Sequence, residues 1–343
     1  MSEFDWAGVA AVDPGGMLDD ILNQPHQIED ALWRVESAGI APADVRGGLV
    51  VCGMGGSAIG ADLARGAIGD RARRPLFTSR DYEPPPWLGE DTLVLCSSYS
   101  GNTEETLASY AAAGDRGAPR VVMTTGGALA DAARADGVPV IGVPSGMQPR
   151  AAVAYMTVGA LEVAALAGVT DSLRSELEAA SGLLRELAAE WGPEGDPDGE
   201  AKSLARGLRG QVPVVYGAEL TAPASVRWRS QLNENAETAA FDGVLPEMDH
   251  NEICGWGQPT FTAVFLSDDE QHARVKQRIE LTADVVVAAG SPVERVRSRG
   301  ETRVERVLAL VLLGDLVSLY LAVLNGVDPS PVARIEDFKQ RLG

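Results

Sequence analysis

The stretch GGLVVCGMGGS (residues 47–57) runs from a short apolar segment straight into a turn rich in glycine. That order is typical of the junction between a buried strand and a helix in an α/β unit, and SAIGADLARGAI (residues 57–68) continues with helical composition. Further apolar strand patterns lie within residues 74–82, 91–114, 118–127 and 137–146. Strands that alternate with helices predict a doubly wound parallel sheet covered by helices on both faces.

Outside this region the chain has a helical beginning, a linker and a weaker copy of the same pattern. Residues 1–46 place apolar residues at helical spacing, and GPEGDPDGE (192–200) has the Pro, Gly and Asp content of a linker. Strand and helix patterns return in residues 211–280 without the glycine- and serine-rich turns. We therefore expect an α/β protein with two doubly wound parallel-sheet domains, each with three α/β/α layers. The expected divisions are a helical segment (1–46), a first domain (47–190), a linker (191–200), a second domain (201–327) and a tail (328–343).

Composition and charge exclude several classes of function. The chain has 49 acidic and 29 basic residues and a net charge of −20, whereas a nucleic-acid-binding protein needs a basic surface. The longest apolar run, residues 307–324, contains Asp315 and Ser318, which favours a buried helix over a membrane span. The first residues lack the basic segment of a signal peptide, and the three cysteines form no disulfide or zinc pattern. We expect a cytoplasmic protein with no nucleic-acid or membrane partner, no metal and no cofactor.

The turn at residues 53–57 suits an anionic group. Gly55 and Gly56 let the backbone approach an anion closely, and Ser57 lies where a helix begins and its first N–H groups are free to bind. Two other interpretations stay open. The turn also matches the Gly-x-Gly-x-x-Ala fingerprint of dinucleotide-binding proteins, with Asp81 as a possible ribose ligand, and it suits a tight turn with close helix packing.

A second strand-to-helix turn, SSYSGNTEET (residues 97–106), favours a phosphate monoester over a dinucleotide. Ser98, Ser100 and Thr103 carry hydroxyls that a turn and a first helical turn can direct at one spot beside the free N–H groups. Ordinary capping of the helix by Ser100 or Thr103 is the alternative, although it would need a single hydroxyl. Both turns lie at carboxyl ends of predicted parallel strands, where such sheets bind ligands.

These two turns, GMGGSAIGADL and SSYSGNTEETL, resemble the two signatures of the sugar isomerase (SIS) domain, and a chain with two such halves resembles the phosphoglucose isomerase superfamily. Three further segments narrow the resemblance: VPSGMQPRAAVAY (143–155), the stretch 227–256 with Asn-Glu-Asn…Pro-Glu-x-x-His-Asn-Glu, and the tail DPSPVARIEDFKQRLG (328–343). They are similar to the bifunctional phosphoglucose/phosphomannose isomerases of archaea and bacteria. The resemblance implies that a sugar phosphate is the small-molecule substrate. The implied reaction interconverts glucose 6-phosphate and fructose 6-phosphate, and also mannose 6-phosphate, through a cis-enediol(ate).

The resemblance also implies a role for each charged residue in these segments. Glu234 matches the base, and a partly buried carboxylate suits a group that takes a proton from one carbon and returns it to the next. Arg150 suits stabilisation of the negative charge that develops on the enediol(ate). His250, supported by Lys339, suits the proton transfers that open the sugar ring.

Each of these residues has a structural interpretation as well. Arg150 also fits a surface charge at a strand end, and Lys339 fits a charge favoured near the end of a C-terminal helix. From the residues alone, Glu234 is not distinguished from the nearby Glu252 as the base. The family resemblance alone favours Glu234.

The resemblance further implies a homodimer in which His250 reaches the active site of the partner subunit. Two departures from the family pattern stand out. Glu237 follows Ala236 where family members usually have a lysine, and Ser330 is the nearest match to the hydroxyl residue that the family links to mannose activity. Fewer residues of the sequence therefore support activity on mannose 6-phosphate than support activity on glucose 6-phosphate.

Three alternative functions remain open at the level of the sequence. A non-catalytic phosphosugar sensor is the main one, although SIS regulators usually carry a basic helix-turn-helix segment, which this acidic chain lacks. The isomerase half of glucosamine-6-phosphate synthase would need a glutaminase domain with an N-terminal cysteine. A dinucleotide-dependent oxidoreductase would use the glycine turn and little else of the pattern.

Overall fold

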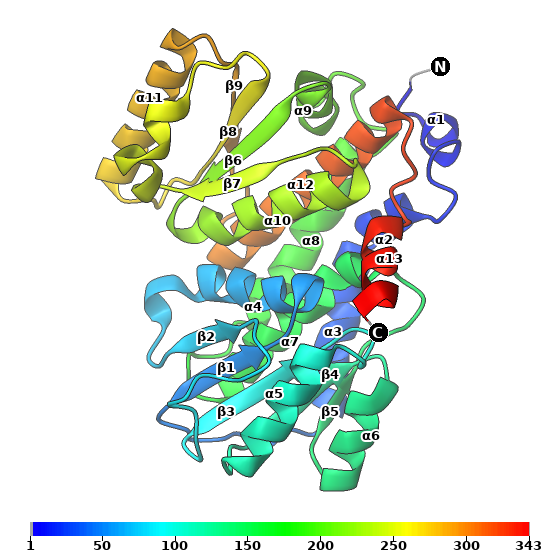
Figure 1. Cartoon of the computed structure of the whole chain (residues 1–343), viewed down its shortest axis with the longest axis vertical. Helices are drawn as coiled ribbons and strands as arrows, with labels where there is room; N and C mark the ends of the chain where they lie inside the picture. Colours follow the sequence, from blue (N-terminus) through cyan, green and yellow to red (C-terminus); the bar gives the residue numbers. More distant parts are fainter. Residues whose placement is uncertain (1–2, 343) are drawn as a thin grey trace. The chain divides into compact units, whose positions relative to one another are not determined.

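The computed structural model describes residues 3–342, so the first two residues of the predicted N-terminal segment and the last residue of the predicted tail lie outside the described part. The chain forms two compact units, each built on one parallel sheet (Figure 1). The sheet A unit comprises Asn23–Leu184 and Arg299–Ala309. The sheet B unit comprises Met1–Leu22, Arg185–Ser298 and Leu310–Gly343. The predicted fold class, two parallel-sheet α/β domains, is confirmed.

Sheet A has the strand order β2-β1-β3-β4-β5, and every neighbouring pair is parallel. All residues of the central strands β1 and β3 are buried, as expected for strands covered on both faces. Helices α3, α4 and α7 pack together on one face, and α5 and α6 cover the other. The strands are β1 (Gly48–Cys52), β2 (Leu76–Ser79), β3 (Thr92–Ser97), β4 (Arg120–Thr124) and β5 (Val140–Gly142). The helices of this unit include α3 (Gln24–Ser37), α4 (Gly55–Ile68), α5 (Glu104–Asp115), α6 (Gly127–Asp136), α7 (Val153–Leu166) and α8 (Arg174–Trp191), whose last turns belong to the other unit.

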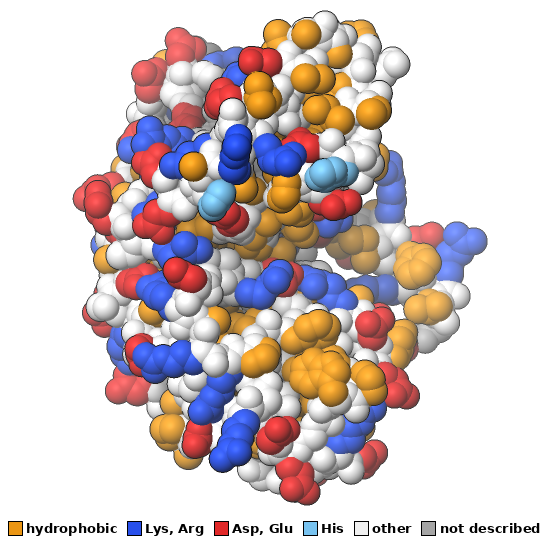
Figure 2. All heavy atoms as spheres, turned by 90° about the vertical axis from the view of Figure 1, so that its left-hand side faces the viewer, with side chains coloured by type: hydrophobic (Ala, Val, Ile, Leu, Met, Phe, Trp, Pro, Cys, Tyr) orange, Lys and Arg blue, Asp and Glu red, His pale blue; other side chains and the backbone are white. Residues whose placement is uncertain are grey.

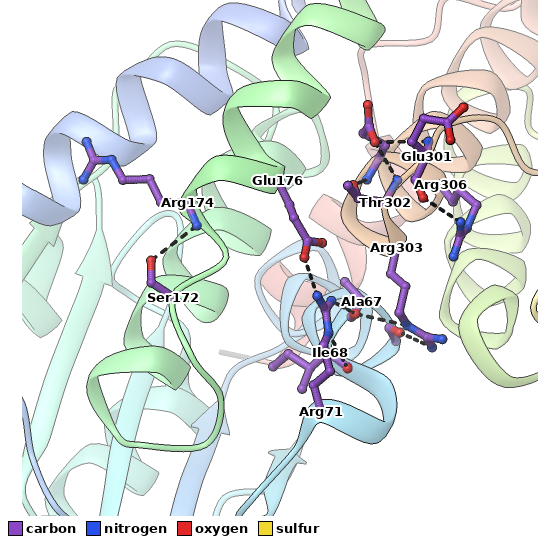
Figure 3. Close-up of polar contacts among 12 residues, drawn as sticks. Ala67, Ile68, Arg71, Ser172, Arg174, Glu176, Glu301, Thr302, Arg303 and Arg306 are labelled. Carbon is purple, nitrogen blue, oxygen red and sulfur yellow. Dashed lines mark hydrogen bonds and ion pairs between the residues drawn. The ribbon is translucent and has the colours of Figure 1, made fainter.

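Helix α4 follows the glycine turn, and its surroundings fix it in its middle and at its C-terminus. In its middle, Gly60 lies so close to α7 that a Cβ atom there would be 2.6 Å from the backbone carbon of Met156. At its C-terminus, Arg71 and Arg303 donate hydrogen bonds of 2.7 and 3.1 Å to the carbonyl oxygens of Ala67 and Gly66 (Figure 3). These guanidinium groups satisfy carbonyls that have no partner within the helix, and their charge opposes the negative end of the helix dipole.

Sheet B has the strand order β7-β6-β8-β9, again with parallel neighbours. Helix α11 buries an apolar stripe against β6 and β8 on one face, and α10 packs against β6 and β7. The strands are β6 (Val212–Gly217), β7 (Phe241–Val244), β8 (Phe261–Ser267) and β9 (Val293–Arg297). The helices of this unit include α1 (Trp6–Ala10), α2 (Met17–Leu22), α9 (Glu200–Leu208), α10 (Ala222–Asn235), α11 (Ala273–Ala288) and α13 (Ala333–Leu342), together with α12 (Arg303–Asn325) from Leu310 onward.

Helix α10 is fastened to α12 by polar groups buried between them. Arg227 and Asp315, which are 2% and 0% exposed, form two hydrogen bonds of 2.9 Å. Trp228 donates from its ring nitrogen to Leu310 O at 2.8 Å and lies against Gly314, where a Cβ atom would be 2.3 Å from that nitrogen. Because a charge this deeply buried is costly without its partner, the pair restricts how α10 can rotate on α12.

The apolar run at residues 307–324 is confirmed as part of a buried helix. Helix α12 is long and apolar enough to cross a membrane by composition alone, but 94% of its most apolar stretch is buried inside the protein.

Two strands of sheet B were not predicted from the sequence. The edge strand β7 is short and has two exposed residues of four, and β9 has three charged residues of five.

The packing of Gly60 against α7 predicts a sharp effect of adding one methyl group. Gly60→Ala should lower the free energy of unfolding by about 1–3 kcal/mol, because the new Cβ atom meets backbone that cannot rotate away. Gly182→Ala on α8 is the matched control, since nothing lies within 4 Å of its Cβ position. That change should be neutral or stabilising by about 0.5–1 kcal/mol through the helix preference of alanine. Equal denaturation midpoints for both variants would contradict the close contact.

Candidate active site

The two polar turns lie side by side at one edge of sheet A. Strands β1 and β3 are parallel neighbours, with Cys52 opposite Cys96 at their ends. The glycine turn follows β1 directly, and the serine turn follows β3. The register therefore brings the N-termini of α4 and α5 to the same edge, where ligands bind in open α/β sheets.

A serine hydroxyl joins the two turns. Ser57, which is 7% exposed, accepts a hydrogen bond of 3.1 Å from the backbone N–H of Tyr99 through its Oγ atom. Within the serine turn, the hydroxyls of Ser98 and Thr103 lie 2.8 Å apart, and Ser98 Oγ also accepts from Gly101 N at 3.1 Å. Thr103 is the N-cap residue of α5 by position, but its hydroxyl bonds to Ser98. The first N–H groups of α5 are thus left for another acceptor, which is how helix N-termini bind anions.

Ser100 lies at the exposed rim of this cluster. Its Oγ atom accepts a 3.2 Å hydrogen bond from Asn102 N. Gly55 is exposed and has a positive φ of 47°, with nothing within 4 Å of its Cβ position. The turn therefore presents open backbone where a phosphoryl group would approach.

Arg150 belongs to the same cluster. It lies in the short 3-10 helix η2 (Pro149–Ala152) and is 4% exposed. A Cβ atom on Gly56 would lie 3.2 Å from Arg150 Cα, so the glycine allows this close approach. Tyr99 holds the same segment through its phenol oxygen, which accepts a 3.0 Å hydrogen bond from Met147 N. The structure thus brings the predicted phosphate-binding residues and Arg150 together within the sheet A unit.

Glu234 lies in the sheet B unit, in the last turn of α10. Its side chain is half-buried and lines a small cavity of about 190 Å³. The other lining residues are Asn233, Glu237 and the segment 331–335, which leads into α13. Across this cavity Arg334 pairs with Glu237 at 3.7 Å, with both side chains largely exposed. The carboxylate of Glu234 therefore lies under the chain segment that carries Lys339, which is itself exposed on α13.

His250 is exposed at the end of the 3-10 helix η4 (Glu247–His250) in the same unit. The residue before it, Asp249, accepts from Arg278 at 2.8 Å and from Thr282 at 2.7 Å. Glu252 accepts a 3.1 Å hydrogen bond from the phenol of Tyr216, and the burial of Tyr216, followed by the charge of Glu252, raises the pKa of that phenol. The sequence analysis did not foresee these contacts, because their partners lie on α11 and β6.

The predicted site residues thus fall into two groups, one in each unit. The sheet A unit carries the six predicted phosphate-binding residues and Arg150, and the sheet B unit carries Glu234, His250 and Lys339. Among residues 3–342, no group of three or more His, Cys, Asp and Glu side chains is placed to hold a metal ion. On the face drawn in Figure 2, acidic and basic side chains are interspersed, unlike the continuous basic stripe of nucleic-acid-binding proteins.

The bond between Ser57 and Tyr99 predicts that Ser57 and Ser100 respond differently to the same substitution. Ser57→Ala leaves a buried N–H group without its acceptor and should lower the free energy of unfolding by about 1–3 kcal/mol. Ser100→Ala at the exposed rim should stay within about 0.5 kcal/mol of the parent. Chemical denaturation of both variants measures the difference. Equal stabilities would mean that the Ser57 hydroxyl does not join the turns.

Comparison with known proteins gives a consistent set of relatives. Residues 197–342 match the family model of the bacterial phospho-glucose isomerase C-terminal SIS domain. The chain is 37% identical to a bifunctional phosphoglucose/phosphomannose isomerase of Caldicellulosiruptor bescii, over 95% of this chain and 98% of that protein. It is 38% identical to the protein of the same name from Aquifex aeolicus, over 86% of this chain and 90% of that protein.

Solved structures support the fold independently. A hypothetical protein of Thermus thermophilus superposes with a TM-score of 0.74 over 95% of this chain and 90% of its own, at 18% identity. At this identity the likeness concerns the fold alone.

Proposed function

The chain belongs to the bifunctional phosphoglucose/phosphomannose isomerase family, and we propose that its isomerase reaction is a proton transfer by Glu234 on a substrate whose phosphoryl group is bound by the turns of sheet A. The protein is a sugar-phosphate isomerase that acts on glucose 6-phosphate, fructose 6-phosphate and mannose 6-phosphate. The observation that best supports the proposed mechanism is that the two groups of residues offer different chemical functions. One group offers amides and hydroxyls, and the other offers a half-buried carboxylate.

The phosphoryl group is bound without a lysine. Free N–H groups of α4 and α5 and the hydroxyls of Ser57 and Ser100 donate to its oxygens. In the bonded pair of Ser98 and Thr103, one hydroxyl donates to the other and the second donates to the phosphoryl group. The positive ends of two helix dipoles at one sheet edge favour a dianion locally, although the chain as a whole has a net charge of −20.

Ring opening precedes isomerisation. The proton of the O1 hydroxyl leaves, the carbonyl forms at C1, the bond between C1 and the ring oxygen breaks, and that oxygen receives a proton. An imidazole can accept the first proton and deliver the second, so His250 carries out this exchange with Lys339 beside it. We propose, as the family suggests, that His250 is supplied by the partner subunit of a homodimer.

Isomerisation then needs one base. In the direction from aldose to ketose, the Glu234 carboxylate removes the proton from C2 and the electron pair forms the C1–C2 double bond of the enediol(ate). The same carboxyl group returns the proton to C1 while the proton of the C2 hydroxyl passes to O1, so that C2 becomes the carbonyl and O1 the hydroxyl. Arg150 stabilises the negative charge on the enediolate oxygens while it lasts. The chemistry requires no redox step and no group transfer, and we propose that these residues carry it out without a cofactor. We further propose that the enzyme works in the cytoplasm.

Replacement of the proposed base tests this mechanism. Glu234→Gln should lower kcat for the conversion of fructose 6-phosphate to glucose 6-phosphate by about 10²–10⁴-fold, because the amide cannot accept the proton. Binding of the sugar phosphate should persist, since the phosphate-binding groups are unchanged. A coupled assay of glucose 6-phosphate measures the rate, and calorimetry measures the binding.

Glu237→Gln is the matched control, because Glu237 lines the same cavity and pairs with Arg334 at the surface. It should retain nearly full activity, and EDTA should leave the parent rate unchanged. Full activity of Glu234→Gln would exclude it as the base. A parent protein that binds phosphosugars without turnover would support the alternative function of a non-catalytic sensor.

A further inference from the structure

The segment around His250 is fastened to its unit on both sides of the histidine. On the near side, Asp249 is only 10% exposed and bonds through both carboxylate oxygens, one to Arg278 and one to Thr282. Arg278 and Thr282 are four residues apart on α11, so they lie on one face of that helix and both donate to the carboxylate. One residue further back, Met248 is fully buried in the apolar cluster between α11 and sheet B.

On the far side, Glu252 is tied to the sheet. Its Oε2 atom accepts a 3.1 Å hydrogen bond from Tyr216, whose ring is stacked on Phe265 at a centroid distance of 5.4 Å. This arrangement depends on a glycine. A Cβ atom on Gly243 would lie 2.5 Å from the Tyr216 ring and 3.1 Å from Glu252 Oε2. Any other residue at position 243 would push this pair apart.

Between these two attachments the chain is held by its own amide. Asn251 accepts from Glu252 N at 2.6 Å and donates to Glu247 at 3.3 Å, which closes the turn over the histidine. His250 is thus an exposed residue in a segment in which Met248, Asp249 and Glu252 are each fixed to the sheet or to α11. Burial of Met248 alone would suffice to pack the segment. The hydrogen bonds of the Asp249 and Glu252 carboxylates, one on each side of His250, are directional and therefore also fix the direction in which the imidazole projects.

We propose that Asp249 and Glu252 are positioning residues that orient His250 for ring opening, through Arg278 and Thr282 on one side and Tyr216 on the other. The inference rests on the proposed function of His250. The proposal predicts which step is affected. Loss of either attachment slows ring opening and leaves the proton transfer by Glu234 intact, because the described side-chain hydrogen bonds of Asp249 and Glu252 go to α11 and β6 and none goes to α10, which carries Glu234.

Two substrates separate these steps. Cyclic glucose 6-phosphate needs both ring opening and enolisation, whereas a 4,5-dideoxy-aldohexose 6-phosphate has no hydroxyl that can close a five- or six-membered ring and needs enolisation alone. Its exchange of the C2 hydrogen with heavy water, followed by NMR, measures the Glu234 step. Asp249→Asn and Tyr216→Phe should each lower turnover of the cyclic substrate about tenfold or more. Both should leave exchange in the open-chain analogue within about twofold of the parent.

Conservative pairs exclude a general loss of structure. Thr282→Val removes the hydroxyl that bonds Asp249 and should show the selective loss, whereas Thr282→Ser retains it and should restore the rate. Arg278→Gln removes the other partner of Asp249 and should show the same selective loss. Arg295→Gln is its matched control, because Arg295 pairs with Glu280 at the surface of the same unit and not with Asp249. It should leave both reactions unchanged.

A double-variant cycle decides between positioning and independent action. In a His250→Asn background, Asp249→Asn should cost no further activity on the cyclic substrate, because a positioning residue acts only through the group that it positions. Equal losses on both substrates, or losses that multiply with that of His250→Asn, would overturn the inference. If His250→Asn itself turns over the cyclic substrate at the parent rate, the proposed role of His250 fails. If His250→Asn is impaired and Asp249→Asn is fully active, the positioning inference alone fails.

Discussion

The hydrogen bond from the Tyr99 amide to the Ser57 hydroxyl is the contact on which the proposed phosphate-binding edge of sheet A depends. It joins two turns that come from different strands and places the N-termini of two helices at one spot. Tyr99 then extends the connection to the Arg150 segment through its phenol. A single buried residue, Tyr99, therefore joins the two turns and the segment that carries Arg150.

Small residues make this alignment possible. Gly56 admits the backbone of Arg150, and Gly60 admits the backbone of α7, so α4 lies closer to its neighbours than any side chain would allow. At the far end of α4, Arg71 and Arg303 satisfy the last carbonyls. The helix is thus fixed from its middle and its C-terminus, while its N-terminal amides stay available to a ligand. In the proposed site these local dipoles favour an anion, although the net charge of the protein opposes it.

Much of this architecture could be predicted from the sequence because it depends on patterns within short segments. Buried parallel strands appear as apolar runs, and the turns appear as clusters of glycine, serine and threonine. The two strands that were missed, β7 and β9, lack such a run, since their outer residues are exposed or charged. Contacts between distant segments were invisible for a different reason. Residue spacing does not predict the hydrogen bonds that Arg278 and Thr282 donate to Asp249. It does not predict the bond from Tyr216 to Glu252 either.

The choice of base illustrates the same limit. In the sequence Glu234 and Glu252 are equivalent carboxylates, and a family resemblance was needed to prefer one. Both carboxylates line cavities, Glu252 one of about 530 Å³ and Glu234 one of about 190 Å³ beneath the segment that leads to Lys339. Glu252 also accepts a hydrogen bond from the buried phenol of Tyr216, which gives it a structural attachment.

A crystal structure with a five-carbon sugar-acid phosphate, whose carboxylate imitates the enediolate, tests the central claim most directly. The account predicts the phosphoryl group among Ser57, Ser98 and Thr103, and the Glu234 carboxylate in van der Waals contact with the ligand carbon that stands for C2. A ligand bound by its phosphoryl group at these turns with Glu234 far from its carboxylate end, in every subunit of the assembly, would contradict it.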